Sequence, residues 1–329
     1  MPAQMTRGQK ILWWLLLAFG TLLAITAGTA LWAYQKLNGN IRTDHAAAEA
    51  LDREAAARPA AEPGEGRNIL VIGHDRGSGT GNARSDTVLL LHLSGDGRRA
   101  DAVHVPRDIV VDIPACRTAD GGRSEAVQAQ FNWAFQYGGA ACTIRTFERL
   151  SGIRVDHHLV LGFEGFADVV DAVGGVEVEL SEDERDPNVG HDLSAGRHLL
   201  DGEQALAYAR ARVHVGDGSD LNRLQRQQHL LGLLHDRITE QGTVTDPAQL
   251  YPLLKAVTAA ITADAGLDSL GELHGLVQDV RAVPDDAVTF RTVPTVPHPT
   301  RPDRLALDTS AAGRLFAALR QDRALPHSV

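Results

Sequence analysis

The sequence predicts an α/β sandwich, in which a central, mostly β sheet is flanked by helices on both faces and is preceded by one N-terminal transmembrane helix. Short apolar runs alternate with helical patterns from residue 67 onward, which is typical of a sheet packed between helices. Residues 11–34 carry no charge at all. The chain of 329 residues is 43% hydrophobic, which is enough for one large domain with a substantial core.

The uncharged N-terminal stretch is long enough to cross a bilayer, because residues 11–34 would span about 36 Å as a helix. Aromatic residues lie near its two ends, where interfacial side chains occur: Trp13, Trp14, Trp32 and Tyr34. We therefore predict a cytoplasmic tail over residues 1–10, a membrane anchor over 11–34 and an extracytoplasmic remainder. A cleaved signal peptide, with small residues at 27–30, is the alternative.

Residues 35–66 separate the anchor from the first apolar strand. Alanine, charged residues and proline dominate the part from His45 to Gly66. This composition predicts a partly helical stalk that ends in a flexible linker. The folded domain is accordingly predicted over residues 67–325.

Alternating strand and helix patterns define the elements of this domain. Strands are expected at 68–73, 86–93, 100–106, 109–114 (continuing the same sheet), 157–163, 176–180 and 287–295. Helices are expected at 127–138, 142–152, 164–175, 201–212, 221–239, 247–262, 267–283 and 309–322. Asp201 is a suitable N-cap and Gly152 a suitable C-terminal cap.

Both cysteines, Cys116 and Cys142, fall in the part expected outside the cytoplasm. An oxidising compartment permits a disulfide between them, which we predict; two unpaired buried thiols are the alternative. Neither cysteine belongs to a C-x-x-C or paired-histidine pattern, so a structural zinc site is not expected.

The chain is acidic, with a formal net charge of −10, which argues against a nucleic-acid partner. Arginines nevertheless gather around one glycine-rich loop. Arg210 and Arg212 end the helix before the loop, while Asp220, Arg223 and Gln227 share one face of the helix after it. Two helix ends would thus direct arginines at an anion with several oxygens, such as pyrophosphate. A solvated face with intrahelical ion pairs is the alternative.

Polar residues also follow the ends of the first three strands. Asp75 follows the first strand, Arg84 precedes the second and Asp86 begins it, and Arg107 and Asp108 follow the third. Ligands of open α/β sheets bind in the crevice at strand ends. Two carboxylates there could hold a hard cation such as Mg²⁺ together with substrate phosphates.

Seven segments resemble, in order, the motifs of the LytR–CpsA–Psr family of membrane-anchored cell-wall ligases: "NILVIGHD", "ARSDT", "VPRD", "FNWAFQYGG", "DAVGGVEV", "LDGEQALAYARAR" and "DLNRLQRQ", within residues 67–240. The resemblance implies a phosphotransferase that moves a glycopolymer phosphate from a polyprenyl-pyrophosphate carrier to a peptidoglycan hydroxyl at the cell membrane. It also suggests an actinobacterial host, with arabinogalactan or a teichoic-type polymer as the cargo.

The resemblance also implies roles for individual residues. Asp75 and Asp86 would ligate Mg²⁺, or Mn²⁺ in its place. The pyrophosphate would be held by Arg84, Arg107, Arg210, Arg212, Asp220 and Arg223, with Gln227, Asn132 and Asp108 on the substrate side. His74 and the segment "QFNWAF", which begins at Gln130, depart from the usual family residues, although Asn132 is retained. Asp75 and Asp108 are the candidates for a general base.

Two other functions use the same residues. In a polyprenyl-pyrophosphate phosphatase, water would replace the sugar hydroxyl as the attacking group. In a non-catalytic binder of lipid-linked glycans, the site would hold the head group without turnover.

Overall fold

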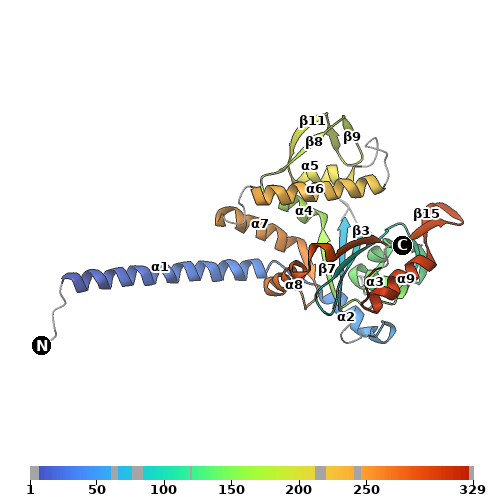
Figure 1. Ribbon diagram of the computed structural model, residues 1–329, viewed down its shortest axis with the longest axis horizontal. Helices are drawn as coiled ribbons and strands as arrows, with labels where there is room; N and C mark the ends of the chain where they lie inside the picture. Colours follow the sequence, from blue (N-terminus) through green and yellow to red (C-terminus); the bar gives the residue numbers. More distant parts are fainter. Residues whose placement is uncertain are drawn as a thin grey trace.

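The computed structural model describes residues 7–60, 66–75, 84–118, 121–211, 220–240 and 246–325. A seven-stranded sheet in the order β1-β12-β7-β2-β3-β4-β13 forms the centre of the domain (Figure 1). Its strands are β1 (Arg42–Thr43), β2 (Arg67–Asp75), β3 (Arg84–Leu93), β4 (Ala100–Val105), β7 (His157–Gly162), β12 (Ile261–Ala263) and β13 (Val288–Thr292). The sheet is mixed: β2 pairs antiparallel with β3 and parallel with β7.

Helices cover both faces of this sheet, as predicted. Leu70 and Ile72 of β2 contribute to a buried cluster with α2 (His45–Arg53), α3 (Trp133–Ser151) and α9 (Thr309–Arg320). The intervening Ile69 points to the opposite face and packs in a cluster with α8 (Leu270–Ala282). This alternation follows from the two-residue period of a β-strand.

A second, smaller layer lies above one edge of the sheet (Figure 1). It contains two hairpin-like pairs, β8 (Val176–Leu180) with β11 (Gly196–Leu200) and β9 (Glu184–Asp186) with β10 (His191–Leu193). Helices α4 (Phe163–Ala172), α5 (Gly202–Arg210), α6 (Asp220–Glu240) and α7 (Pro247–Ala260) pack with these strands. Asp201 caps α5 through a capping box with Gln204, which confirms the predicted N-cap.

The N-terminal helix α1 (Arg7–Asn38) extends away from the domain (Figure 1). Its segment from Trp13 to Asn38 is long and apolar enough to span a membrane, by length and composition, and none of its most apolar window is buried inside the protein. The structure therefore agrees with the predicted membrane anchor.

The predicted stalk over residues 35–66 is wrong for most of its length. Strand β1 joins the central sheet through β12, and α2 buries Ala47 and Leu51 in the core. Arg58 then pairs with the buried Glu148 of α3. Alanine-rich composition suits a packed helix as well as a solvated one, and here Ala47 and Leu51 lie four residues apart on one face.

The helix predicted over 127–138 is also wrong in its first part. Strand β6 (Val127–Gln130) pairs with β5 (Val110–Ile113) as a separate two-stranded sheet, so β5 does not continue the central sheet. Helix α3 begins only at Trp133 and continues to Ser151, with a break in helical geometry at Gly138 and Gly139. The hairpin of β14 (Thr295–His298) and β15 (Arg301–Leu307) was not predicted.

The predicted disulfide between Cys116 and Cys142 is present. It ties the segment after β5 to α3 where the helix is broken. Gly138 lies against the bridge, since a Cβ there would meet the carbonyl oxygen of Arg117 at 2.5 Å and the Cβ of Cys142 at 2.9 Å. A residue without a side chain is therefore required at this crossing.

Candidate active site

An ion pair joins the neighbouring ends of β3 and β4. The Arg107 Nη1 atom donates to Asp86 Oδ1 at 2.5 Å, and its Nε lies 3.5 Å from Asp108 Oδ2. Asp86 is the extra residue at a β-bulge, because Thr87 pairs with Gly73 while Ser85 pairs with His74. Bulges redirect side chains next to active sites, and this one accompanies the contact of Asp86 with Arg107.

Arg84 begins β3 directly opposite Asp75, the last residue of β2. Its Nε donates to Gln136 Oε1 at 3.0 Å, and its guanidinium lies 5.1 Å from the centre of the Trp133 ring. Both contacts come from the first turn of α3, so this helix orients the Arg84 side chain.

The turn before α3 is fastened to the end of β4. The backbone N–H of Asn132 donates to the carbonyl oxygen of Arg107 at 3.2 Å, and Gln130 Nε2 donates to Asp108 Oδ1 at 2.5 Å. Asn132 itself is buried, and its Oδ1 atom has no hydrogen-bond partner among the described residues. A buried acceptor without a partner is costly, so this oxygen is suited to accept from a water or a ligand.

Arg210 reaches the same edge of the sheet from the layer above. It ends α5, and its guanidinium lies 5.7 Å from the centre of the Phe163 ring. Phe163 follows β7, whose last residue, Gly162, pairs with His74 of β2. His74 in turn stacks on Phe135 of α3, with ring centres 5.1 Å apart.

The predicted residues with described side chains thus lie around one edge of the sheet: Arg84, Asp86, Arg107, Asp108, Asn132 and Arg210. Arg212 lies outside the described residues. The backbones of Asp75, Asp220, Arg223 and Gln227 are described within β2 and α6, but their side chains are outside the described set. Their predicted roles stay predictions.

A buried polar cluster that sequence reasoning missed holds α5 and α6 together. Arg226 donates to the carbonyl oxygen of Ala211 at 3.3 Å and to Glu184 Oε1 at 3.4 Å, and it lies 5.0 Å from the Tyr208 ring centre. His191 Nε2 lies 3.0 Å from Glu184 Oε2. Burial raises the pKa of Tyr208 above its ordinary value of 10.0, against the opposing effect of Arg226. The sequence signal that could have indicated this cluster is the arginine spacing of the motif that begins at Asp220, which includes Arg226.

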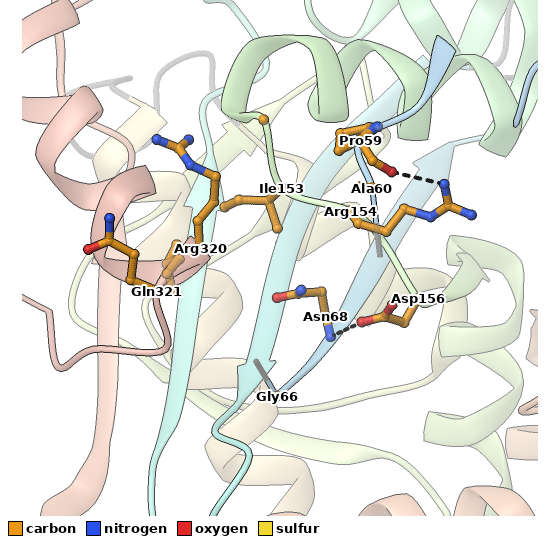
Figure 2. Close-up of a pocket in the computed structure, with 11 residues that line it drawn as sticks. Pro59, Ala60, Gly66, Asn68, Ile153, Arg154, Asp156, Arg320 and Gln321 are labelled. Carbon is orange, nitrogen blue, oxygen red and sulfur yellow. Dashed lines mark hydrogen bonds between the residues drawn. The ribbon is translucent and has the colours of Figure 1, made fainter. Parts of the chain in front are cut away.

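A cavity of about 320 Å³ lies at the opposite end of β2 (Figure 2). Its polar groups are engaged with the protein: Arg154 donates to the carbonyl oxygen of Pro59 at 3.1 Å, and Asp156 accepts from the backbone N–H of Asn68 at 2.8 Å. Asn68 and Asp75 are seven residues apart on one strand, or about 23 Å. This cavity is therefore separate from the arginine site.

The residues at the arginine site suit a hard divalent cation. Within the described part of the chain, no group of three or more His, Cys, Asp or Glu side chains could enclose a metal ion. Asp86 offers a carboxylate at the bulge, although it already accepts from Arg107, and the side chain of Asp75 is outside the described set. Mg²⁺ can be held by one or two carboxylates when substrate phosphates and waters supply its other ligands, so the described carboxylate of Asp86 is compatible with such a site.

The fold and the site define the class of this protein: it is an α/β protein with an N-terminal helix able to span a membrane and a group of arginines at the ends of its central strands. The LytR_cpsA_psr family is matched over residues 33–314, so the chain belongs to that family. The matched region includes β1 and α2, in keeping with their packing in the domain.

Curated relatives of the chain act in cell-wall synthesis. The chain is 31% identical over 292 residues to the "Probable cell wall biosynthesis protein LcpB" of Corynebacterium glutamicum, covering 84% of this chain and 63% of that protein. It is 31% identical over 208 residues to the "Polyisoprenyl-teichoic acid--peptidoglycan teichoic acid transferase TagU" of Halalkalibacterium halodurans, covering 63% of this chain and 64% of that one. The chain thus spans less than two thirds of the length of these relatives.

Solved structures share the fold. A "LytR-Csp2A-Psr enzyme from Actinomyces oris" superposes with a TM-score of 0.57 at 25% identity, covering 80% of this chain and 93% of that chain. The predicted α/β fold class and the family resemblance are therefore both confirmed.

Proposed function

We propose that this protein is a membrane-anchored phosphotransferase that moves a glycopolymer phosphate from a polyprenyl-pyrophosphate carrier to a peptidoglycan hydroxyl. Membership of the LytR–CpsA–Psr family and the printed function of the relative TagU support this reaction. The peptidoglycan and the lipid-linked glycan are the proposed partners, and the membrane holds both the carrier lipid and helix α1.

The observation that carries the proposal is that three arginines from different elements lie around one edge of the sheet. Arg84 comes from β3, Arg107 from the end of β4, and Arg210 from the end of α5. Each is oriented by a contact within the protein: Gln136 for Arg84, Asp86 for Arg107 and Phe163 for Arg210. Guanidinium groups held in this way suit a polyanion with several oxygens.

In the proposed reaction, the oxygen of the acceptor hydroxyl forms a bond to the glycan-side phosphorus. The bond from this phosphorus to the bridging oxygen breaks, and the polyprenyl phosphate leaves with its electron pair. The arginines stabilise the negative charge that develops on the non-bridging oxygens and on the leaving group. The hydroxyl proton passes to a base.

Asp108 is a poor candidate for this base. Its carboxylate accepts from Gln130 and lies beside Arg107. Both contacts engage the oxygens of this carboxylate, which leaves it less available to accept a proton from the acceptor hydroxyl. We assign Asp108 the role of positioning Arg107, and Asp75 is the candidate base or metal ligand that remains.

Asp75 and Asp86 would hold Mg²⁺. When bound, the ion would polarise the phosphoryl oxygens and neutralise part of their charge. Binding would require Asp86 to share its carboxylate between the ion and Arg107, and the buried Oδ1 of Asn132 is a further oxygen of suitable chemistry in the same region.

The proposed orientation places the N-terminus in the cytoplasm and the catalytic domain outside it. The disulfide between Cys116 and Cys142 supports this side of the membrane, because disulfides persist in oxidising compartments.

The test uses the full chain reconstituted in vesicles with a polyprenyl-pyrophosphate glycan and a peptidoglycan fragment. Mass spectrometry would follow the phosphate-linked adduct with Mg²⁺ or with EDTA. Arg210→Ala is expected to abolish adduct formation, whereas Arg197→Ala, an exposed arginine on β11, is expected to leave it unchanged. Release of polyprenyl phosphate without an adduct would identify a phosphatase instead. Binding without any turnover would identify a binder.

A further inference from the structure

The membrane helix is fixed to the domain. Strand β1 follows α1 after a short turn and pairs with β12 of the central sheet. Asn38, at the end of α1, accepts through its Oδ1 from the backbone N–H of Leu270 at 2.9 Å, and Thr43 Oγ1 donates to Asp268 Oδ2 at 2.6 Å. The height of the domain above the bilayer is therefore set by packing.

Helix α7 runs beside the last turns of α1 and the residues that follow them (Figure 1). The Trp32 ring stacks on Tyr251, with ring centres 6.1 Å apart and planes at 20°. Farther along both segments, Asn40 Nδ2 lies 3.4 Å from Thr258 Oγ1. Because residue numbers rise together at these two contacts, the N-terminal end of α7 points back toward the membrane.

The depth of the N-terminal end of α7 in the bilayer follows from the length of α1. The uncharged residues 11–34 span about 36 Å, whereas the hydrocarbon core is about 30 Å thick, so Trp32 lies near its outer boundary. Tyr251 stacks on Trp32 and must lie at a similar depth. The first turns of α7 therefore lie in the headgroup layer.

The composition of α7 fits such a place. Between Pro247 and Ala260 it carries no acidic residue and a single charge, that of Lys255. Four of its exposed residues form a stripe along the helix, Ala248, Pro252, Lys255 and Ala259, spaced at i, i+4, i+7 and i+11, and Pro247 and Gln249 are exposed beside its first residue. A lysine above an apolar helix tip can reach anionic lipid phosphates.

One acidic residue, Asp246, limits how deeply the N-terminal end of α7 can enter the bilayer. Asp246, the N-cap of α7, accepts from the backbone N–H of Ala248 at 2.9 Å and from Gln249 Nε2 at 3.2 Å. A carboxylate bonded in this way is stable among hydrated headgroups but costly in hydrocarbon. The helix end thus belongs in the headgroup layer and does not enter the acyl chains.

We infer that α7 is a second membrane contact of this protein, with its first two turns lying in the phospholipid headgroup layer beside the outer end of α1. The inference concerns the docking of the domain and does not depend on the proposed reaction. It requires only that α1 spans the bilayer.

The contact would also fix the height of the arginine site. At its other end α7 packs closely on α4, where a Cβ on Gly165 would clash with the Cβ of Ala260. Helix α4 begins at Phe163, on which Arg210 lies. From Tyr251 to Ala260 the α7 axis covers at most about 14 Å. Two rigidly packed helices thus join the headgroup layer to Arg210.

The test compares two positions on the exposed stripe of α7, in the full chain reconstituted in phosphatidylcholine–phosphatidylglycerol vesicles. Ala248→Cys and Ala259→Cys would each be labelled with an environment-sensitive fluorophore, while the native cysteines stay protected in their disulfide. Both positions are exposed alanines on one helix, so they are matched in chemistry and in folding risk. Circular dichroism would establish that both variants are folded.

The Ala248→Cys label is expected to show blue-shifted emission and roughly two-fold or stronger quenching by headgroup nitroxide lipids, relative to Ala259→Cys. Nitroxides deep in the acyl chains are expected to quench it less. Solvent-like emission at both positions would overturn the inference. Equal quenching at both positions, or stronger quenching by the deep nitroxide, would overturn the arrangement proposed for α7.

Discussion

The buried ion pair between Arg58 and Glu148 tests whether the segment after the membrane helix is part of the domain. Arg58 Nε and Nη2 donate to Glu148 at 2.9 and 2.7 Å, and Nη2 also donates to the carbonyl oxygen of Val155 at 3.0 Å. The two side chains are only 8% and 1% exposed. Arg58→Ala would leave the Glu148 charge buried with the Val155 backbone N–H as its remaining described donor. Removing one partner of such a pair costs about 3–5 kcal/mol.

The assay is urea unfolding of the full chain in detergent, followed by far-ultraviolet circular dichroism. Arg53→Ala is the matched control, since Arg53 pairs with Glu49 on the surface of α2, and exposed pairs of this kind contribute about 0.5 kcal/mol or less. Arg58→Met combined with Glu148→Leu is expected to recover part of the loss, because no charge is then left buried. If Arg58→Ala cost no more than Arg53→Ala, the segment would be a stalk and our account of it would be refuted.

Three further predictions concern the disulfide, a histidine and the arginine site. Replacing Cys116 and Cys142 by serine is expected to lower the free energy of unfolding by about 3.5 kcal/mol in the chain-entropy description of a loop with a sequence separation of 26, measured by urea titration. A hydrogen bond to Asp264 raises the pKa of His157 above its ordinary value of 6.5, so its stabilising effect is present below that pH and is lost as the pH rises through the raised pKa. The difference in melting temperature between wild type and His157→Asn should therefore shrink between about pH 6 and pH 9, and a constant difference would contradict this account. Arg107→Lys keeps the charge but loses the planar fork that meets Asp86, so we expect transfer to fall on the order of a hundred-fold while binding of Mg²⁺, followed by calorimetry, persists.

Much of the fold was predictable from local patterns. The strand 68–73, the capped helix after Asp201 and the C-terminal cap at Gly152 each depend on residues close in sequence, and the structure has all three. The first part of the segment 127–138 was predicted wrongly, because apolar and aromatic residues there follow a helical spacing that continues into α3. Pairing with β5 determines its conformation instead, and that contact is not local.

The site was predictable in its residue types but not in its contacts. The positions of Arg84, Arg107 and Arg210 at strand ends and helix ends can be inferred from the amino-acid pattern alone. The bulge at Asp86 could not be predicted, because one extra residue in a strand leaves no clear trace in an apolar pattern. The stacking of His74 on Phe135 could not be predicted either, because these two residues are distant in sequence and meet only in the folded domain. Both lie within segments that depart from the family pattern.

The bridge between Cys116 and Cys142 has a consequence for where the protein can work. It holds α3 at Cys142, just after the break at Gly138 and Gly139. The turn before this break carries Gln136, which accepts from Arg84, and Trp133, over which Arg84 lies. In a reducing compartment the disulfide would be reduced. Helix α3, which positions the Arg84 side chain, would then lose its covalent link to Cys116. If the arginine site binds pyrophosphate as proposed, its full assembly depends on an oxidising compartment, and a chain with reduced cysteines would hold Arg84 without this covalent support.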